Sequence, residues 1–361
     1  MTVTQPARRS PRTFGVEEEV ILLEPGTLAP VDVAEEVIAE IADVEATVGW
    51  VDSEFLKAQV EFSSPVLADA DAAERVVREF RRALGAAADR RQLIAASIGT
   101  PFGHGVSSVA GGERYRRFVA ELGAIRPDHR IQGLHVHVAV RDRDEGVAVM
   151  RALRPWLAPL IALTANSPCF GGIDTGFASW RTIVGRRFTT ASVPPIFADA
   201  ADYQRRVDAL VGLGTTLDRQ SIYWMMRLAE RYPTIELRAF DAQLSADETV
   251  AAALLARALV EVAAACAHAE MVDSAVWHAA RHGLDDALVD PATAALAPAW
   301  VVVDRMLDAA RPALQAAGDE ERVQAVVDRT RAEGNGAARQ RAALADGEAT
   351  LGRLLRATFV A

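Results

Sequence analysis

The segment Gly15-Val16-Glu17-Glu18-Glu19-Val20-Ile21-Leu22-Leu23 carries three consecutive glutamates inside an apolar run that is typical of a β-strand. In a strand, residues i and i+2 point to the same face, so Glu17 and Glu19 project together while Glu18 points the opposite way. Burying ionised carboxylates is costly unless cations or hydrogen-bond donors answer them. We therefore interpret Glu18 as a structural or solvent-facing residue. Glu17 and Glu19 are either the solvent face of a half-buried strand or part of a metal site.

Three further strand-like segments combine charged and apolar residues in the same way. They are Val60-Glu61-Phe62, Leu134-His135-Val136-His137-Val138 and Ile235-Glu236-Leu237-Arg238. Because residues two apart share a face, His135 projects with His137, and Glu236 projects with Arg238. Any one segment is explained equally well as the solvent face of a strand. The recurrence in four segments favours a site where carboxylates converge, and such sites usually hold a metal ion.

The length and composition of the chain limit its partners. It has 361 residues, half of them apolar, which is enough for a sizeable core in one large domain or in two fused units. The formal charge of −10 argues against a broad surface for nucleic acid or for an anionic membrane. No uninterrupted apolar run reaches the length of a transmembrane helix. We therefore expect no nucleic-acid partner and no membrane partner.

The cysteines and the start of the chain bear on the cellular compartment. Cys169 and Cys266 are the only cysteines, and neither has a second cysteine at CxxC spacing, which excludes a disulfide scaffold and a cysteine-based zinc site. A cytoplasmic location, with its reducing conditions, fits best. Residues 1–12 are polar, and no apolar signal-peptide core follows them, so we expect a disordered leader there.

The basic side chains of this protein are almost all arginine, and Lys57 is the only lysine. No phosphate-binding loop of the GxxxxGK(S/T) type is present. Any phosphate chemistry in this chain would therefore depend on arginine and on metal ions.

The first two-thirds of the chain alternates strand-like and helix-like segments. Strands are expected at 13–23, 56–63, 94–98 and 132–141, and helices at 31–44, 68–92, 113–123 and 145–166. A turn around residues 231–233 separates the runs 221–228 and 234–241, which we interpret as a hairpin. After Ser245 the pattern is almost wholly helical. This order predicts one α+β domain over residues 13–361, with the active site on a face of its sheet.

Several motifs resemble those of one enzyme family in both order and spacing. They are Phe14-Gly15-Val16-Glu17-Glu18-Glu19, Glu54 followed by Val60-Glu61, Gly133-Leu134-His135-Val136-His137-Val138, Ala165-Asn166-Ser167-Pro168, Asp174-Thr175-Gly176-Phe177-Ala178-Ser179-Trp180-Arg181, and Arg231-Tyr232-Pro233-Thr234-Ile235-Glu236-Leu237-Arg238. Together with Trp277–Leu284, they resemble the type 2 glutamate–cysteine ligases, a family of carboxylate–amine ligases. The resemblance covers roughly residues 13–290.

The resemblance implies a fold and a reaction. The fold is related to the catalytic domain of glutamine synthetase, with a curved, mainly antiparallel sheet, helices packed outside it and a helical C-terminal third. The reaction is ATP-dependent amide formation, in which a small carboxylate becomes an acyl phosphate and an amine then displaces the phosphate. Glutamate, activated at its γ-carboxylate, is the expected carboxylate, and a homodimer is compatible with the family. The metal is expected to be Mg²⁺, with Mn²⁺ as the alternative, because phosphoryl transfer requires divalent ions held by oxygen ligands.

The resemblance also implies roles for individual residues. The expected metal ligands are Glu17, Glu19, Glu54, Glu61, His135 and Glu236. Catalytic roles fall to Glu61, Glu236 and Arg238, and contacts with the nucleotide or substrate fall to His135, Arg181 and Arg281. The remaining histidines that we interpret as incidental are His104, His129 and His268. Glu54 precedes Glu61 by seven residues, an odd separation that would place them on opposite faces of one continuous strand. A bend or loop must therefore lie between them if both bind metal.

The chain departs from the family in one motif. Where these ligases read Trp-Asp-aliphatic-Arg-Pro, this chain has Tyr223-Trp224-Met225-Met226-Arg227-Leu228. Met225 thus puts a thioether in place of a carboxylate, so we expect an acceptor amine other than cysteine.

Two other functions stay open from the sequence. The first is a metal-dependent hydrolase, because His-x-His on a strand also binds transition metals. The second is a catalytically degenerate paralogue that only binds a nucleotide or an amino acid, which the departure at Met225 would allow. Carboxylates outnumber imidazoles in the charged segments, and this favours magnesium over zinc.

Overall fold

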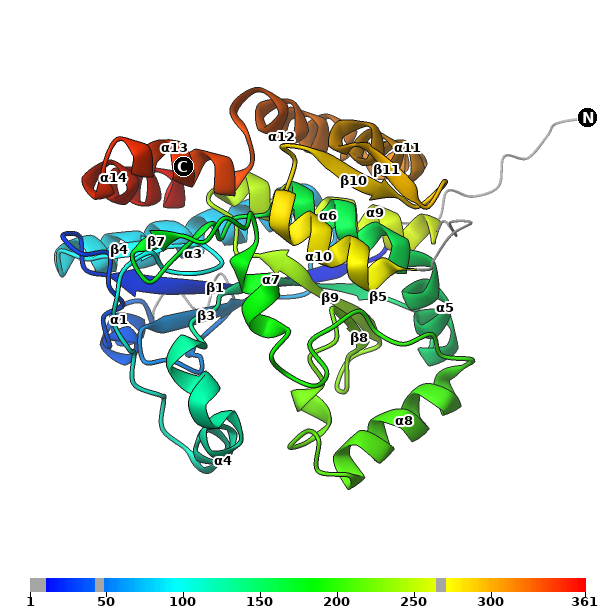
Figure 1. Cartoon of the computed structure of the whole chain (residues 1–361), viewed down its shortest axis with the longest axis horizontal. Coiled ribbons are helices and arrows are strands. Elements are labelled where there is room, and N and C mark those ends of the chain that lie inside the picture. Colours follow the sequence, from blue (N-terminus) through cyan, green and yellow to red (C-terminus); the bar gives the residue numbers. More distant parts are fainter. Residues whose placement is uncertain (1–10, 43–48, 264–270) are drawn as a thin grey trace, which may run out of the picture.

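An antiparallel sheet runs through the middle of the molecule, and most of the helices lie on one side of it (Figure 1). The computed structural model describes residues 11–42, 49–263 and 271–361. The main sheet has the strand order β2-β3-β1-β5-β9-β8, and β4 also pairs with β1. Its strands are β1 (Phe14–Leu23), β2 (Trp50–Ser53), β3 (Gln59–Ser63), β4 (Ile94–Ala96), β5 (Gly133–Ala139), β8 (Met226–Leu228) and β9 (Thr234–Asp241). Two small hairpins are formed by β6 (Cys169–Phe170) with β7 (Ile173–Asp174) and by β10 (Ala287–Asp290) with β11 (Ala295–Pro298).

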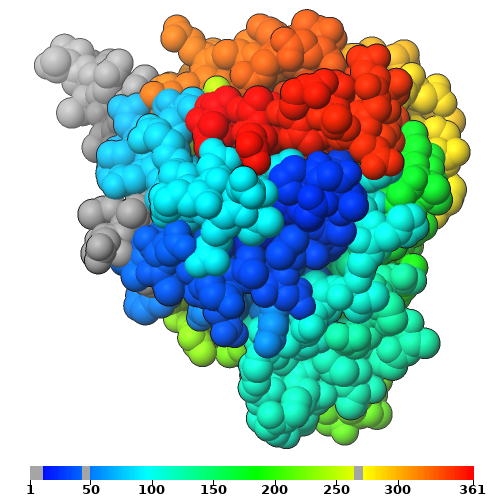
Figure 2. Space-filling view, turned by 90° about the vertical axis from the view of Figure 1, so that its left-hand side faces the viewer, coloured from blue at the N-terminus to red at the C-terminus, as the bar shows by residue number. Residues whose placement is uncertain are grey.

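The helices fall into two groups in the view of Figure 1. The group above the sheet contains α3 (Ala70–Arg90), α6 (Leu157–Thr164), α9 (Ala246–Val262), α10 (Val272–His282), α11 (Ala299–Ala317), α12 (Glu320–Glu333), α13 (Gly336–Ala345) and α14 (Glu348–Phe359). The remaining α-helices are α1 (Ala34–Glu40), α4 (Glu113–Leu122), α5 (Arg143–Leu153), α7 (Trp180–Gly185) and α8 (Ala200–Gly212). Figure 2 shows the red C-terminal helices lying against the blue and cyan N-terminal part of the chain, with the α4 region projecting below. The helix-covered side of the sheet therefore holds the core, and the other side is framed by α4 and α8.

The central strand β1 alternates between these two sides. Val16, Glu18 and Val20 are fully buried and face the helices, whereas Glu17 and Glu19 keep partial exposure on the open side. Glu18 forms an ion pair with Arg81 of α3, and both side chains are completely buried. Glu18 is therefore structural, and the alternation expected from the sequence places Glu17 and Glu19 together on the open face.

The helices α3 and α9 cover this sheet because their ends are capped and their inner faces are apolar. The Asp69 side chain accepts a hydrogen bond from the backbone N–H of Ala72 at the start of α3. At α9, Ser245 and Glu248 form a reciprocal capping box. Buried residues of both helices belong to one continuous hydrophobic core with β1, β5 and β9. Burial of that face stabilises the helices more than their intrinsic propensity does.

Most expected elements are confirmed, with differences that have local causes. The helix expected at 145–166 is two helices, α5 and α6, joined by a 3-10 turn (Arg154–Trp156). Pro155 lies in that turn, where it lacks the N–H that a continuous helix would require. The hairpin of β10 and β11 interrupts the C-terminal part that the sequence predicted to be helical. The strand expected at 56–63 begins only at Gln59, because a turn joins it to β2, which the sequence did not predict. The α+β class with an antiparallel sheet is confirmed.

The start of the chain differs in part from the disordered leader expected at residues 1–12. Residues 1–10 lie outside the described residues. Arg12, however, is held in place, since its Nη2 donates to Glu145 at 3.0 Å and its Nε donates to Glu261 at 2.7 Å. The prediction of disorder is therefore wrong for Arg12, which pairs with two carboxylates from distant parts of the sequence.

One helical run has the length and apolar character of a membrane span. It covers Arg143–Thr164, and 78% of its most apolar window is buried inside the structure. Such burial is typical of a core helix, and length with hydropathy alone is weak support for a membrane span.

Candidate active site

The strand register brings the charged segments together on the open face of the sheet. Glu17 of β1 lies opposite His135 of β5, and Glu19 of β1 lies opposite Glu61 of β3. On the next strand, Glu236 of β9 lies opposite His137 of β5. Side chains directly opposite each other on an antiparallel pair have Cβ atoms about 4.5–5.5 Å apart. Four segments that are distant in sequence therefore form one cluster.

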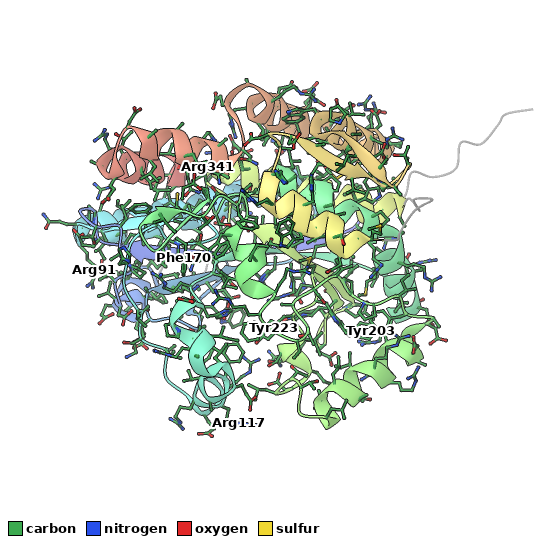
Figure 3. The ribbon with its side chains drawn as sticks, viewed as in Figure 1. Arg91, Arg117, Phe170, Tyr203, Tyr223 and Arg341 are labelled. Carbon is green, nitrogen blue, oxygen red and sulfur yellow. The ribbon has the colours of Figure 1, made fainter. Side chains whose placement is uncertain are left out.

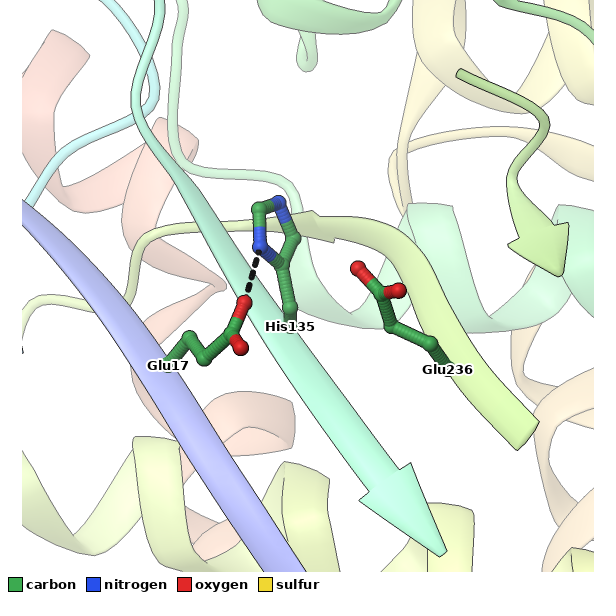
Figure 4. A group of neighbouring side chains, drawn as sticks. All are labelled: Glu17, His135 and Glu236. Carbon is green, nitrogen blue, oxygen red and sulfur yellow. Dashed lines mark hydrogen bonds and ion pairs between the residues drawn. The ribbon is translucent and has the colours of Figure 1, made fainter. Parts of the chain in front are cut away.

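The first group in this cluster contains Glu17, His135 and Glu236 (Figure 4). One potential ligand atom from each of them lies within 4.8 Å of the others. His135 Nδ1 lies 3.1 Å from Glu17 Oε2, and His137 Nε2 lies 3.1 Å from Glu17 Oε1. Burial opposes the charge on Glu17, but the hydrogen bonds from the two histidines outweigh burial and lower its pKa. Glu17 is therefore ionised, and its carboxylate oxygens could bind a cation.

The second group contains Glu19, Glu61 and His135, whose ligand atoms also lie within 4.8 Å of one another. The Glu54 side chain is hydrogen-bonded to Glu61. Glu54 reaches this position because β2 ends at Ser53 and a turn leads into β3, which is the bend that the spacing of the two glutamates required. All six residues predicted as metal ligands thus lie in one cluster, and His135 belongs to both groups.

The protonation of the second group supports its use as a cation site. Burial and the charge of Glu54 raise the pKa of Glu61 well above its usual value and raise the pKa of Glu19 to about 7. Burial and the charge of Arg238 lower the pKa of His135 to about 4, so its imidazole is neutral and able to bind metal. Crowded carboxylates of this kind are stabilised by a divalent cation, and mainly oxygen ligands suit Mg²⁺ or Mn²⁺. The donor set therefore fits the ion that the sequence predicted.

Arg238 is the cation nearest to the first group. It is paired with Glu236, and Arg227 Nε donates to the other oxygen of Glu236 at 2.6 Å. Burial opposes the charge on Glu236, but Arg238 and Arg227 outweigh burial and lower its pKa to about 2. Glu236 thus holds the Arg238 guanidinium beside His135, whose Nδ1 is 3.4 Å away.

A pocket lies beside the cluster and has two chemically different halves. Glu19, Glu54, His135, Arg181 and Arg238 line the charged half. The other half is lined by Phe55, Phe118, His129, Phe188, Tyr223 and Met225. Of these, Tyr223 is labelled in Figure 3. The sequence pointed to Met225 but gave no signal for the phenylalanines and Tyr223, which come from a turn, a helix and two loops and share no sequence pattern.

Arg181 is the second arginine of the charged half, and it is half-buried with spare hydrogen-bonding capacity. Its two terminal nitrogens donate only to the backbone carbonyl of Arg238, each at 3.3 Å, and its Nε has no partner among the described residues. The absence of a side chain at Gly133 makes room for it, because a Cβ there would meet Arg181 Nη2 at 2.2 Å. A guanidinium fork in a pocket, with no carboxylate partner among the described residues, is suited to a carboxylate or a phosphate.

Asp241, at the end of β9, holds the segment that carries Arg181. One carboxylate oxygen accepts from the Asn166 backbone N–H at 2.8 Å and from Ser167 Oγ at 2.7 Å, and the other accepts from Ser179 Oγ at 2.9 Å. Ser167 Oγ in turn accepts from the backbone N–H of Arg181 at 3.0 Å. This buried network fixes the position of Arg181 relative to the sheet.

His129 lies in the wall of the pocket, although the sequence suggested an incidental histidine. Its ring contacts those of Phe55 and Phe188, with centroids 5.6 and 4.9 Å apart, and its Nδ1 has no partner among the described residues. Burial, and then the charges of Arg187 and Arg181, lower its pKa to about 4 from 6.5. His129 is therefore a neutral member of the apolar half. Of the other two, His268 lies outside the described residues, and His104 is exposed.

We expect His129 to make the protein less stable in acid. Between pH 6.5 and 4 the unfolded chain binds a proton that the folded chain does not, so this contribution to stability is complete above pH 6.5 and is lost as the pH falls. At pH 5 the loss is about 2 kcal/mol. Urea unfolding at pH 7.5 and pH 5 should show a larger loss for the wild type than for His129→Gln. Equal losses would contradict a His129 that stays neutral in the folded protein.

The structure does not place Arg281 with the other predicted residues. It lies on α10, which packs against α6 and α7, and its guanidinium carbon is 5.1 Å from the centre of the Phe177 ring. It is not among the residues that line the pocket. Its predicted role in binding a nucleotide or substrate therefore has no support from the geometry.

Comparison with known proteins connects this site to one family. The sequence matches glutamate-cysteine ligase family 2 over residues 13–357. Proteins from Saccharopolyspora erythraea and Nocardia farcinica, both named "putative glutamate–cysteine ligase 2-1", are each 38% identical to this chain. The alignments cover 91% of this chain in both cases, and 89% and 88% of the two relatives.

Two solved structures share the fold at low sequence identity. A glutamate–cysteine ligase from Francisella tularensis, solved in complex with AMP, superposes with a TM-score of 0.67 and 12% identity over 98% of this chain and 90% of that protein. A bifunctional glutathione synthetase from Pasteurella multocida superposes with a TM-score of 0.68 and 14% identity over 97% of this chain, which spans about half (53%) of that protein. The sequence match and the shared fold agree, and the chain belongs to glutamate-cysteine ligase family 2.

Proposed function

We propose that this protein is an ATP-dependent carboxylate–amine ligase that activates glutamate at its γ-carboxylate and joins it to an amine. The observation that carries the proposal is the convergence of five glutamates, His135 and Arg238 on one face of the sheet, next to the Arg181 guanidinium, whose Nε has no partner among the described residues. Family membership and the AMP complex of the Francisella protein support a nucleotide in this site.

The residues of the cluster have distinct tasks in this reaction. Glu17, Glu19, Glu54, Glu61, His135 and Glu236 would hold Mg²⁺ or Mn²⁺, which neutralises phosphate charge when bound. Arg238, held in place by Glu236, stabilises the charge that develops on the γ-phosphoryl group as it moves to the carboxylate. Arg181 binds a carboxylate of the donor through its planar fork. The products of this half-reaction are γ-glutamyl phosphate and ADP.

The two alternative functions are less well supported. A hydrolase with a transition metal would need histidine-rich ligation, but His137 uses its two nitrogens on Glu17 and on Thr234, whose Oγ1 is 3.0 Å away. The cluster therefore offers mainly oxygen atoms. A degenerate paralogue would be expected to lose charged residues from the cluster, whereas this chain keeps five glutamates, His135 and Arg238 close together.

ADP release measured in a coupled assay with ATP, glutamate and a panel of amines tests the proposal. We expect ADP release to depend on glutamate, and mass spectrometry should detect a γ-glutamyl amide. ADP release that is independent of any carboxylate would favour hydrolysis. Nucleotide binding without any turnover would favour the degenerate paralogue.

ATP binding should require a divalent metal, because carboxylates of the cluster would otherwise repel the phosphates. Calorimetry with ATP in the presence of Mg²⁺, and again after treatment with EDTA, should show binding only in the first case. Restoring Mg²⁺ or adding Mn²⁺ should restore it. Equal affinity with and without metal would show that ATP binds this site without a metal ion.

Asp241→Asn should impair the binding of glutamate more than turnover. Asparagine keeps the size of the side chain, but its NH2 group cannot accept a hydrogen bond as the second carboxylate oxygen of Asp241 does. At least one hydrogen bond of the network must therefore break. We expect KM for glutamate to rise by roughly tenfold, corresponding to about 1–2 kcal/mol, with a smaller change in kcat. Asp304→Asn, which removes an exposed ion pair with Arg331, is the control. An unchanged KM would show that Asp241 does not position Arg181 for the donor.

The cytoplasmic location and the homodimer that the sequence suggested stay predictions. Gel filtration of the purified protein tests the homodimer.

A further inference from the structure

The apolar half of the pocket is a continuous aromatic surface. The Phe118 and Phe188 rings are stacked with centroids 5.5 Å apart, and Tyr223 packs against Phe188 at 5.4 Å. Phe55 meets Phe118 edge-on at 5.1 Å, and His129 fills the space between Phe55 and Phe188. These rings hold one another in place, so the surface is preformed and suited to an apolar group.

This surface begins directly beside the reacting groups. The backbone N–H of Arg238 donates to the carbonyl of Met225 at 2.8 Å, so the Met225 side chain lies next to the strand that carries the catalytic guanidinium. The N–H of Met225 donates to Ser192 O at 3.0 Å, which ties it to the loop that follows Phe188. A molecule that lies on the aromatic surface can therefore reach a phosphorylated carboxylate held by the charged half.

The charges around the pocket limit what that molecule can be. Among the described residues that line the pocket, the arginines are Arg181 and Arg238, and the proposed function assigns both to the donor and the phosphoryl group. Two nearby arginines already have partners, since Arg187 pairs with Asp128 and Arg114 pairs with Asp218. An acceptor with its own carboxylate would place a negative charge against the aromatic surface, where no unassigned arginine lines the described part of the pocket to neutralise it.

We propose that the acceptor is a primary amine that carries an aromatic or branched aliphatic group and no carboxylate, with that group bound by Phe55, Phe118, Phe188, Tyr223 and Met225. The inference rests on the proposed function and names its second substrate. The amine nitrogen attacks the γ-carbonyl carbon of γ-glutamyl phosphate, and the C–N bond forms. The bond between this carbon and the oxygen that bridges to phosphorus breaks, and inorganic phosphate leaves with the electron pair. The proton lost by nitrogen passes to the phosphate.

Matched pairs of acceptors test the class directly. The pairs are phenethylamine with phenylalanine, isoamylamine with leucine, and cysteamine with cysteine, and the amide products are measured by mass spectrometry. We expect kcat/KM to be at least about tenfold higher for the amine than for the amino acid in the first two pairs. We also expect kcat/KM to be higher for phenethylamine and for isoamylamine than for cysteamine. Equal or reversed preference in the first two pairs would overturn the proposal.

Variants locate the acceptor on the aromatic surface. Phe188→Ala should lower kcat/KM for phenethylamine by about tenfold and leave KM for ATP unchanged. Met225→Asp should shift the preference towards small polar or charged amines. The control is Phe170→Ala, which removes another half-buried phenylalanine, in contact with Arg130 and outside the pocket, and should leave both constants unchanged. If Phe188→Ala raises KM for ATP instead, the aromatic surface binds the adenine and the proposal is wrong.

Hydroxylamine separates failure of this inference from failure of the proposed function. It traps γ-glutamyl phosphate as the hydroxamate and has no apolar group, so it reports the first half-reaction alone. Wild type and Phe188→Ala should form the hydroxamate at similar rates. Hydroxamate without a preference for apolar amines would overturn the acceptor class and leave the ligase intact. No hydroxamate and no amide would contradict the ligase itself.

Discussion

Replacing Glu61 with glutamine should lower turnover at least about a hundredfold while the protein stays folded. Glu61 lies opposite Glu19, is hydrogen-bonded to Glu54 and belongs to the second group of residues that could hold a metal ion. Glutamine keeps the size and polarity of the side chain and removes one negative charge, so the cluster should bind Mg²⁺ more weakly. ADP release measures turnover, and calorimetry measures the affinity for Mg²⁺.

The stability of the same variant gives an independent readout. Burial and neighbouring carboxylates raise the pKa of Glu61 in the folded protein, so its ionisation destabilises the metal-free fold as the pH rises above the ordinary value of 4.5. At pH 8 without metal, Glu61→Gln should therefore be at least as stable as the wild type towards urea. The control is Glu35→Gln, an exposed glutamate of α1, which should change neither turnover nor stability. Near-normal turnover in Glu61→Gln would show that the glutamate is only structural.

The largest loss of stability is expected for Arg81→Met. Arg81 Nε donates to Glu18 Oε2 at 3.0 Å, and its terminal nitrogens also donate to the backbone carbonyls of Gln243 and Leu244. Both charged side chains are completely buried, and removing one partner leaves the other as an unpaired charge in the core. We expect the free energy of unfolding to fall by roughly 3–5 kcal/mol. Urea unfolding of the variant and the wild type measures this loss, with the same dependence of unfolding free energy on urea concentration fitted to both.

A double variant shows whether the unpaired charge is the cause. Glu18→Gln combined with Arg81→Met removes both charges and leaves only lost hydrogen bonds. It should be more stable than Arg81→Met alone, whereas additive losses would make the double variant less stable. Two results would contradict a tight buried ion pair. One is an unfolding free energy of Arg81→Met within about 1 kcal/mol of the wild type, and the other is a double variant less stable than Arg81→Met.

The charged part of the site was predictable because a strand has a period of two. Glu17 and Glu19, His135 and His137, and Glu236 and Arg238 had to project in pairs, and the antiparallel register then aligned these pairs across neighbouring strands. Glu54 was predictable only through the resemblance, since its position depends on a turn. The odd spacing to Glu61 nonetheless indicated that such a turn must exist.

The apolar part of the site could not be predicted in the same way. Phe55, Phe118, Phe188 and Tyr223 meet only through tertiary packing of a turn, a helix and two loops, and no periodicity connects them. His129 was missed because a single histidine gives no signal of its environment. For Arg281, a motif-like helix suggested a site residue, and the structure places it on α10, which packs on α6 and α7, away from the residues that line the pocket.

The transfer of oxygen from glutamate to phosphate distinguishes a ligase that forms an acyl phosphate from an enzyme that hydrolyses ATP. Glutamate labelled with ¹⁸O in its γ-carboxylate is incubated with ATP, Mg²⁺ and an acceptor amine, and the phosphate released is analysed by mass spectrometry. If γ-glutamyl phosphate forms on the cluster of Glu17, Glu61, His135 and Glu236, each phosphate carries one labelled oxygen, and EDTA abolishes the transfer. Phosphate whose added oxygen comes only from water would contradict an acyl-phosphate intermediate and identify the protein as a hydrolase.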